Sequence, residues 1–352
     1  MTVMRRVVVY PGRIVVEAAD IPAPGPDEAL VRTLVAGVCG SDLHAAHGRH
    51  PFVALPYRPG HEVVGVIEAA GSRWAPGFKW ALGQRVIVEP DLPCWTCKMC
   101  TTGRENLCEN LQFFGCGYAQ GGMADYFTLA ANRLHPVPDA LDDNTAALIE
   151  PLSTPVHAVR LAGDVAGRSV AILGAGTIGL FTLAVLRAHG AGPVVSTDPN
   201  LAKRQRAEAL GADVTIDARA PDVTGQVREA LGGSADIVFD CVAVQSSVDQ
   251  AIAIADKGGT VMVVGVPAGE VSVPLPIVQD HQIRIQGSAT YLPEDYAESA
   301  DLLGRGAIRT SDFVTVTRPL AQVAEAFDLA WSGQHVKVLV TVGERGLTDV
   351  HA

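Results

Sequence analysis

A stretch without a single charged side chain, residues 169–186, constrains the fold of this chain more than any other segment. Its length approaches that of a membrane-spanning helix, but Gly174, Gly176 and Gly179 lie close together within it, and glycines interrupt regular structure. A buried strand at 170–173, a glycine turn and a buried helix explain the stretch better, because strands covered on both faces are apolar throughout. We therefore expect a parallel sheet here and no transmembrane helix.

The segments after this turn alternate between short apolar, β-prone runs and helical patterns. Such alternation predicts parallel β-α-β crossover units, the units of a doubly wound α/β domain. The predicted strands are 170–173, 194–197, 214–216, 237–241 and 260–265. The predicted helices include 203–210, 226–231 and 247–255. Short strands are expected to return after Pro274.

The first part of the chain, up to about residue 150, has a different pattern. It is rich in glycine and proline and contains short β-prone runs at 7–10, 30–35, 63–67 and 85–88, which predict a β-rich domain. The segment 314–342 mixes strand with an amphipathic helix at 320–331 and is expected to fold back onto this first region. A chain of 352 residues exceeds the size that one core usually serves, so two domains are expected.

The overall charge excludes one class of partner. Hydrophobic residues make up 48% and charged residues 18%, a globular balance, and the formal net charge is −11. Such an acidic protein is not expected to bind nucleic acid. Arg5 and Arg6 precede only a short apolar run that ends at Tyr10, without the small residues of a signal-peptide cleavage site. We therefore expect a cytoplasmic protein with no membrane partner.

The glycine turn is a candidate phosphate-binding site. Its motif comprises Gly174, Gly176, Thr177, Ile178 and Gly179, directly after a predicted strand and at the start of a predicted helix. The first glycine makes the tight turn, the second admits a pyrophosphate against backbone N–H groups, and the third lets helix and strand approach closely. An ordinary β-α turn is the alternative, but the strand and helix context favours dinucleotide binding.

An acidic residue at the end of the next strand predicts which dinucleotide is bound. Asp198 is placed to accept hydrogen bonds from the adenosine ribose hydroxyls and would repel a 2′-phosphate, so NAD is favoured over NADP. Lys203 is a further candidate for a cation that faces the cofactor. Alternatively, Asp198 caps the turn or helix that begins at Pro199.

Four cysteines form a candidate structural metal site. Cys94, Cys97, Cys100 and Cys108 follow a C-x2-C-x2-C-x7-C spacing, and four thiolates complete a tetrahedral zinc without leaving a position for substrate. An iron-sulfur cluster is the competing cofactor, although its bacterial motif has three residues before the last cysteine and a proline after it, where this chain has Glu109. Clustered thiols without an export signal favour metal over disulfides.

A second candidate metal site includes Cys39, His61 and Glu62, which lie in turn-rich stretches beside predicted strands. A thiolate, an imidazole and a carboxylate suit a catalytic zinc, which uses three protein ligands and keeps one position for water or substrate. A core thiol and a hydrogen-bonded imidazole are the alternative interpretation. Cys116 and Cys241 are expected to be inert core thiols.

These motifs resemble those of the zinc-dependent medium-chain alcohol dehydrogenases, in the same order and across nearly the whole chain. The similar segments are the run from Cys39 to His44, the Gly-His-Glu run at 60–62, the four-cysteine loop and the glycine turn. Glu150, in Glu-Pro-Leu-Ser, resembles the polyol (sorbitol-type) dehydrogenase branch. The resemblance implies a GroES-like β-rich catalytic domain at 1–151 and 288–352, and a Rossmann NAD-binding domain at 152–287.

The resemblance also implies roles for single residues. Cys39, His61 and Glu62 would bind the catalytic zinc, with Glu150 beside the metal directly or through its water, and either glutamate could complete the coordination shell. Two zinc ions per chain are expected. The open zinc position would bind a secondary alcohol whose hydride passes to the nicotinamide ring. Ser41 and His44 match the family's proton relay, although Ser41 and its neighbour Asp42 could instead cap a short helix.

Some positions depart from the polyol branch. Ala45 and Thr290 stand where sorbitol dehydrogenases resemble one another in having a tyrosine and an arginine, so sorbitol itself is not the expected substrate. Tyr291 is a candidate for the substrate pocket, or else an aromatic ring packed at a strand end. We expect a small secondary alcohol, polyol or cyclitol-like, with threonine-type amino-alcohol oxidation as the alternative.

Two other classes of protein remain open from sequence. One is an iron-sulfur electron-transfer protein, and the other is a non-catalytic nucleotide-binding protein that keeps the fold without turnover. The presence of Cys39, His61 and Glu62 together argues against the non-catalytic protein, because a site that has lost its activity does not need metal-binding groups. By analogy with the family, a homo-oligomer, tetramer or dimer, is expected.

Overall fold

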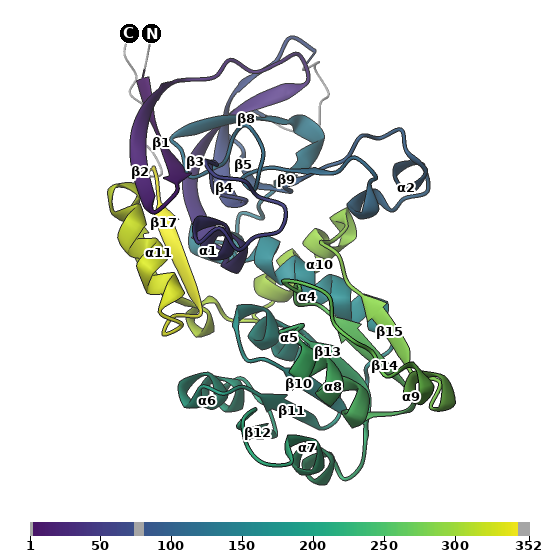
Figure 1. Ribbon diagram of the computed structural model, residues 1–352. Coiled ribbons are helices and arrows are strands. Elements are labelled where there is room, and N and C mark those ends of the chain that lie inside the picture. Colours follow the sequence, from purple (N-terminus) through teal and green to yellow (C-terminus); the bar gives the residue numbers. More distant parts are fainter. Residues whose placement is uncertain (1–2, 74–80, 344–352) are drawn as a thin grey trace. The chain divides into compact units, whose positions relative to one another are not determined.

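The computed structural model describes residues 3–73 and 81–343 and divides into two compact units (Figure 1). The first unit comprises Met1–Pro151, Ser299–Gly304 and Phe313–Ala352, and the second comprises Leu152–Glu298 and Arg305–Asp312. The predicted mixed α/β class is confirmed, with a β-rich unit and a parallel-sheet unit. The predicted domain boundaries at 151/152 and 287/288 stay a prediction. None of the described helices is long and apolar enough to cross a membrane.

The first unit is built on a seven-stranded sheet within the described residues, in the order β16-β17-β3-β4-β5-β9, with β8 also paired to β3. Its strands are β3 (Glu28–Val38), β4 (Glu62–Ala70), β5 (Arg85–Val88), β8 (Tyr126–Ala130), β9 (Leu134–Pro136), β16 (Val314–Pro319) and β17 (Lys337–Thr341). The predicted return of the C-terminal segment is therefore found, since β17 pairs with β3.

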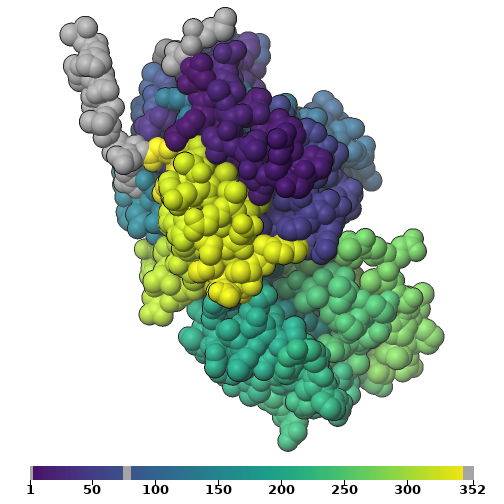
Figure 2. Space-filling model, turned by 60° about the vertical axis from the view of Figure 1, so that its left-hand side comes forward, coloured from purple at the N-terminus to yellow at the C-terminus, as the bar shows by residue number. Residues whose placement is uncertain are grey.

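Smaller elements complete the first unit. They are the hairpin β1 (Val3–Tyr10) and β2 (Arg13–Asp20), the pair β6 (Asp91–Leu92) and β7 (Gln112–Phe113), and the helices α1 (Gly40–Ala46), α2 (Lys98–Thr101), α3 (Asp143–Ala146) and α11 (Val323–Trp331). In Figure 2 the hairpin and α11 form neighbouring purple and yellow patches on one face.

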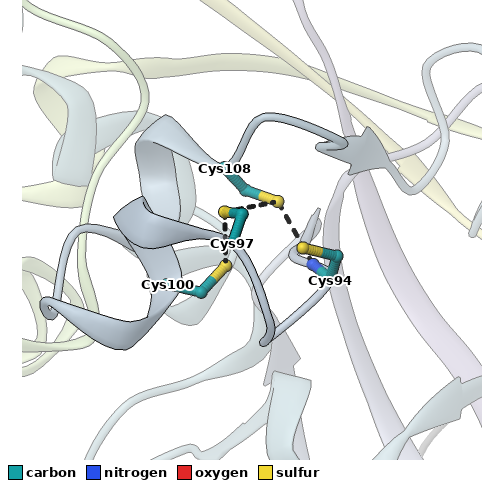
Figure 3. Close-up of side chains that lie close together, drawn as sticks. All are labelled: Cys94, Cys97, Cys100 and Cys108. Carbon is teal, nitrogen blue, oxygen red and sulfur yellow. Dashed lines mark hydrogen bonds between the residues drawn. The ribbon is translucent and has the colours of Figure 1, made fainter.

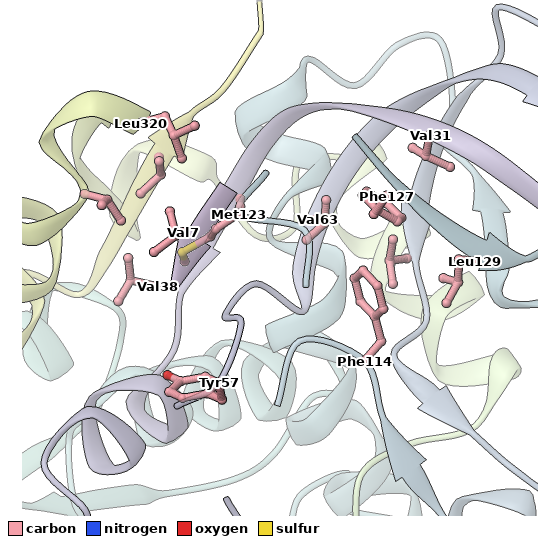
Figure 4. Close-up of a cluster of buried hydrophobic side chains, with 14 of the residues drawn as sticks. Val7, Val31, Val38, Tyr57, Val63, Phe114, Met123, Phe127, Leu129 and Leu320 are labelled. Carbon is pink, nitrogen blue, oxygen red and sulfur yellow. The ribbon is translucent and has the colours of Figure 1, made fainter. Parts of the chain in front are cut away.

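The core of the first unit lies between its strands, where alternate side chains of β3, β4 and β8 meet (Figure 4). The rings of Phe114 and Phe127 are fully buried, with centroids 4.9 Å apart. Tyr57 and Val63 belong to the same cluster and lie next to the residues of the second candidate metal site. The apolar core therefore fixes the backbone from which that site is built.

The second unit contains a parallel sheet of six strands, in the order β12-β11-β10-β13-β14-β15 among the described residues. Its strands are β10 (Val170–Leu173), β11 (Val194–Thr197), β12 (Val214–Ile216), β13 (Ala235–Asp240), β14 (Ala255–Val263) and β15 (Arg284–Gly287). Its helices include α5 (Thr177–Ala188), α6 (Leu201–Ala209), α7 (Val223–Leu231), α8 (Gln245–Ile254) and α9 (Leu275–Asp280). The strand order reverses at β10, which is the place where doubly wound sheets bind nucleotides.

The structure differs from the sequence-based expectation at three places. After Pro274 the chain first forms helix α9, because proline is compatible with the first turn of a helix, and only then returns to a strand. Helix α4 (Ile149–Ala162) was not predicted, since Pro151 and Pro155 interrupt its pattern. Helix α10 (Pro293–Gly304) was also missed.

Candidate metal and nucleotide sites

The four-cysteine loop brings its sulfur atoms together around one point (Figure 3). The Sγ atoms of Cys94, Cys97, Cys100 and Cys108 all lie within 4.8 Å of one another. Cys97 is 3.5 Å from Cys100 and 3.9 Å from Cys108, and the backbone N–H of Cys94 points at the sulfur of Cys108 from 3.2 Å. This arrangement fits a tetrahedral metal bound by four thiolates.

The pKa shifts of two thiols in this loop are also consistent with a bound metal. Hydrogen bonds from Thr96 lower the pKa of Cys94 to about 5, whereas burial and the neighbouring thiols raise the pKa of Cys100 to about 12. Four thiolates this close repel one another, and a divalent cation removes that repulsion while it displaces the remaining protons.

The second group of metal-binding side chains lies where two neighbouring strands of the first unit meet short turns. Cys39 directly follows β3 and precedes α1, and His61 and Glu62 stand at the start of β4. One ligand atom from each of the three residues lies within 4.8 Å of the others. The predicted set is thus brought together. Strand pairing explains this, because Gly37 lies opposite Glu62 in the ladder between β3 and β4.

Two buried residues support this set: Asp42, which sequence reasoning considered only as a helix cap, and Tyr57, to which it gave no role. The carboxylate of Asp42 accepts a hydrogen bond from the backbone N–H of Cys39 at 3.1 Å, and Tyr57 donates its hydroxyl to the same carboxylate at 3.3 Å. Asp42 Oδ1 lies 3.9 Å from His61 Nδ1. Asp42 therefore fixes the turn that presents the thiol and lies beside the imidazole, a position typical of the outer-shell partners of metal ligands.

Lys337 is a further residue of the site that sequence reasoning missed. Its ammonium lies 2.5 Å from Glu62 Oε1 and 3.3 Å from the carbonyl oxygen of Val38. Burial alone lowers the pKa of Lys337, but the charges of Glu62 and Cys39 outweigh it and raise that pKa, so the ammonium stays charged. A single lysine within the apolar run 336–340 was the signal that could have drawn attention to it.

A buried carboxylate oxygen of the set fits a metal ion. Glu62 Oε2 has no hydrogen-bond partner within the part of the chain that the structure describes, whereas His61 Nδ1 faces Asp42 and leaves Nε2 for a ligand. Buried polar atoms are nearly always satisfied, so such an orphan calls for a missing partner. The charges agree: burial lowers the pKa of His61, yet Asp42, Cys39 and Glu150 together raise it well above its usual value. The donor set therefore fits a cation such as zinc.

Glu150 lies near this set but outside its innermost group. It stands in the first turn of α4, is buried, and its charge raises the pKa values of His61 and Lys337. The ligand atoms within 4.8 Å of one another belong to Cys39, His61 and Glu62. Glu62 is therefore the glutamate whose position fits a direct ligand, and Glu150 fits the outer position.

The predicted relay residues share helix α1. Ser41 Oγ lies 3.4 Å from His61 Nε2, which places the hydroxyl at the edge of the candidate metal set. His44 lies one turn further on, with its ring edge-on to Trp331 of α11 at 6.2 Å. The ring of Phe113 lies edge-on to His61 at 5.4 Å and forms an apolar wall that the sequence did not reveal.

The two remaining thiols, Cys116 and Cys241, are half-buried, and their predicted inertness stays a prediction. Burial raises the pKa of both Cys116 and Cys241 to about 12. Thiols with such high pKa values carry little thiolate near neutral pH and are poor nucleophiles.

The glycine turn of the second unit joins β10 to α5 and has the geometry of a phosphate cradle. Gly174 has a φ of 96°, which favours glycine. A Cβ on Gly179 would lie 1.8 Å from the carbonyl oxygen of Gly174, so only glycine permits this close approach of helix and turn. A Cβ on Gly176 would meet no described atom within 4 Å, so the space above Gly176 is free for a ligand. Thr177 and Ile178 form the first turn of α5.

Asp198 and Lys203 flank this turn. Asp198 follows β11, is buried, and accepts hydrogen bonds from the N–H groups of Ala175 at 3.0 Å and Asn200 at 2.8 Å. Lys203 lies in the first turn of α6, which Asn200 caps. Its predicted contact with a cofactor stays a prediction, as does the contact of Asp198 with ribose.

Tyr291 is 2% exposed, and its ring packs edge-on against Tyr296 with centroids 5.2 Å apart. Thr290 before it has a φ of 43°, a left-handed conformation that is uncommon for threonine. The role of Tyr291 in substrate binding stays a prediction.

A β-rich unit with a four-thiolate loop and a Cys-His-Glu set, together with a dinucleotide-type parallel sheet, defines a metal-dependent dehydrogenase. Comparison with known families agrees: residues 25–139 match the alcohol dehydrogenase GroES-like domain, and residues 177–305 match the zinc-binding dehydrogenase domain. The chain belongs to the zinc-dependent medium-chain dehydrogenase family. The predicted resemblance, including its polyol branch, is confirmed, and the protein is an oxidoreductase rather than an iron-sulfur carrier or a non-catalytic binding protein.

Several relatives cover nearly the whole chain. L-galactonate-5-dehydrogenase of Escherichia coli K12 is 34% identical and covers 90% of this chain and 92% of its own length. Sorbitol dehydrogenase of Bacillus subtilis is 31% identical and covers 93% of this chain and 94% of its own length. Two solved structures each superpose with a TM-score of 0.88. One is a zinc-binding dehydrogenase of Sinorhizobium meliloti 1021 bound to NADP, which is 33% identical and covers 97% of this chain and 100% of its own. The other is the 2R,3R-butanediol dehydrogenase of Bacillus subtilis, which is 26% identical and covers 96% of this chain and 99% of its own.

Proposed function

We propose that this enzyme oxidises a secondary hydroxyl group of a small polyhydroxy compound, a polyol or cyclitol, with NAD as hydride acceptor and two zinc ions per chain. The observation that carries the proposal is the convergence of Cys39, His61 and Glu62, with the buried Oε2 of Glu62 left without a partner among the described residues. The names of the relatives, which include sorbitol and L-galactonate dehydrogenases, support a polyhydroxy substrate.

Cys39, His61 and Glu62 would hold the catalytic zinc, and the four-cysteine loop would hold the structural one. When bound, the catalytic ion supplies a Lewis acid that makes a substrate hydroxyl easier to deprotonate, and bound NAD supplies the acceptor for the hydride. The protein's own side chains then manage the proton. We infer that Ser41 Oγ, 3.4 Å from His61 Nε2, accepts the hydroxyl proton, and that the exposed His44 on the same helix passes it to solvent.

An apolar ring borders the proposed catalytic set. Phe113 packs edge-on against His61 with ring centroids 5.4 Å apart, and Cys116 is near enough for the charges of His61 and Asp42 to act on its thiol. Phe113 and Cys116 are therefore candidates to border the reacting hydroxyl.

The choice of NAD rests on Asp198. Its buried carboxylate ends β11 beside the glycine turn, where it favours ribose hydroxyl groups and disfavours a 2′-phosphate. A solved relative binds NADP, so the two cofactors need a direct comparison. The ratio of kcat/KM for NAD to kcat/KM for NADP tests this part of the proposal, and a ratio below one would reject it.

A substrate screen tests the reaction itself. Reduction of NAD is followed with polyols, cyclitols, simple secondary alcohols and threonine, and zinc content is measured on the same preparation. Activity with a polyol or cyclitol and two zinc ions per chain is the expected result. Preference for threonine would replace the substrate class, and one zinc ion or none would reject the catalytic metal set. A homodimer or homotetramer, expected by analogy, can be checked by measuring the molar mass in solution.

A further inference from the structure

A buried ion pair links the last described strand of the first unit to the candidate catalytic metal set. Lys337 Nζ and Glu62 Oε1 are 2.5 Å apart, and the two side chains are 3% and 0% exposed. Lys337 begins β17 and Glu62 begins β4, with β3 between them. The lysine therefore reaches across a whole strand to meet its partner.

Glycine makes this reach possible. Gly37 of β3 lies opposite Leu339 of β17 on one side and Glu62 of β4 on the other, so these residues share one face of the sheet. Lys337 lies two residues before Leu339 and therefore points to the same face. A Cβ on Gly37 would lie 1.8 Å from Glu62 Oε2. The missing side chain of Gly37 thus leaves the space in which the carboxylate lies.

The two oxygens of Glu62 have different surroundings. Oε1 accepts the hydrogen bond from Lys337, whereas Oε2 has no partner among the described residues. Lys337 is further fixed by its hydrogen bond to the carbonyl oxygen of Val38, the residue before Cys39. A buried charge without a partner is costly, so the pair is expected to stay formed when a metal binds. Only Oε2 then remains for the metal.

We propose that Lys337 is a positioning residue that restricts Glu62 to ligation through one oxygen and thereby keeps a coordination position open for substrate. This inference rests on the proposed zinc set of Cys39, His61 and Glu62. Carboxylates bind metal ions through one oxygen or through both, and a second oxygen from Glu62 would occupy the position that a catalytic site must leave free. Lys337 prevents this because it holds Oε1.

The variant Lys337→Met tests the proposal, because methionine has a similar length and no charge. Zinc is kept at the four-cysteine loop, and cobalt(II) is exchanged into the set of Cys39, His61 and Glu62. Cobalt absorbs visible light more strongly with four ligands than with five or six, so its spectrum reports the coordination number. We expect weaker visible absorption in the variant, retained metal, and a KM for the alcohol that is raised roughly 10-fold or more with a smaller change in kcat.

The matched control is the double variant Lys337→Met/Glu62→Gln. A glutamine amide offers a single oxygen, so the strong four-coordinate absorption should return if Glu62 was the source of the extra ligand. Weak absorption that persists in the double variant would overturn the proposal. A purely structural ion pair predicts another pattern for Lys337→Met, namely a lower melting temperature with an unchanged cobalt spectrum and unchanged KM, and that pattern would also overturn it.

Gly37→Ala provides an independent test if Lys337→Met does not fold. The new Cβ displaces Oε2, and because Lys337 holds Oε1, the carboxylate cannot turn to offer its other oxygen. We expect Gly37→Ala to retain one zinc ion per chain, at the four-cysteine loop. Two tightly held ions in this variant would contradict the role of Lys337. A wild-type enzyme that itself holds one ion would instead reject the proposed catalytic set, so the two failures are distinguishable.

Discussion

The carboxylate of Asp198 accepts a hydrogen bond from the backbone N–H of Ala175 at 3.0 Å, so the residue expected to select the cofactor also holds the glycine turn in place. Its other oxygen accepts from the N–H of Asn200, at the start of α6. A single buried side chain thus joins the ends of two neighbouring strands to the turns that follow them. Any substitution of Asp198 is expected to change the geometry of the turn as well as cofactor choice.

Replacing Asp198 by alanine should lower kcat/KM for NAD by roughly 10- to 100-fold, because hydrogen bonds to a charged group contribute about 1.5–3 kcal/mol. Removal of the negative charge should also raise the relative activity with NADP. Asp198→Asn is the matched control, since its amide oxygen can still accept from Ala175. Steady-state kinetics with both cofactors give the answer, and an unchanged preference for NAD in both variants would speak against the assignment.

Two glycines of the same turn should respond differently to replacement by alanine, one mainly in stability and the other mainly in NAD binding. Gly179→Ala places a methyl group 1.8 Å from the carbonyl oxygen of Gly174 and should destabilise the fold by about 1–3 kcal/mol. Gly176→Ala meets no described atom within 4 Å and should cost about 1 kcal/mol or less, yet it should block the pyrophosphate. Thermal unfolding with and without NAD measures both effects. Normal NAD binding by Gly176→Ala would place the cofactor elsewhere.

The two proposed zinc sites should separate in their mutant phenotypes. Cys39→Ser should lose more activity than the roughly 10- to 100-fold loss typical of outer-shell partners, because it removes a direct ligand. Much of its NAD affinity should remain. Cys97→Ser should first lower the melting temperature, since a structural zinc contributes its binding free energy to folding. Metal analysis, NAD titration and thermal unfolding of both variants form the test. Full activity in Cys39→Ser would contradict the mechanism.

The aromatic pair in the core of the first unit should be sensitive to truncation. Phe127 is fully buried with its ring 4.9 Å from that of Phe114, so Phe127→Ala should cost about 3–5 kcal/mol of unfolding free energy. Phe127→Leu keeps most of the volume and should cost less. Phe52 is 84% exposed, and its replacement by alanine should stay within about 0.5 kcal/mol of the wild type. Urea unfolding of the zinc-loaded proteins measures all three, and equal losses would mean that the core was misidentified.

Local patterns predicted the parts of the fold that local physics controls. Strands β10, β11 and β12 have the predicted bounds, because each is a short β-prone run between turn residues, fully buried in β10 and β11. The helix α4 was hidden because Pro155 lies within it, where only tertiary packing compensates for the lost hydrogen bond. The sequence also indicated Cys39, His61 and Glu62. It marked Lys337 only as a lysine in an apolar run and could not show its partner, because Lys337 meets Glu62 only through the pairing of β17 with β3.

The pairing of β17 with β3 has a consequence for how the protein is made. Ribosomes release a chain from its N-terminus, and Lys337 follows Glu62 after 275 residues. The whole nucleotide-binding unit, which ends at Asp312, leaves the ribosome before β17 can take its place beside β3. A nascent chain therefore carries an incomplete active centre until synthesis is nearly finished, and prematurely terminated chains should be unable to mature into working enzyme.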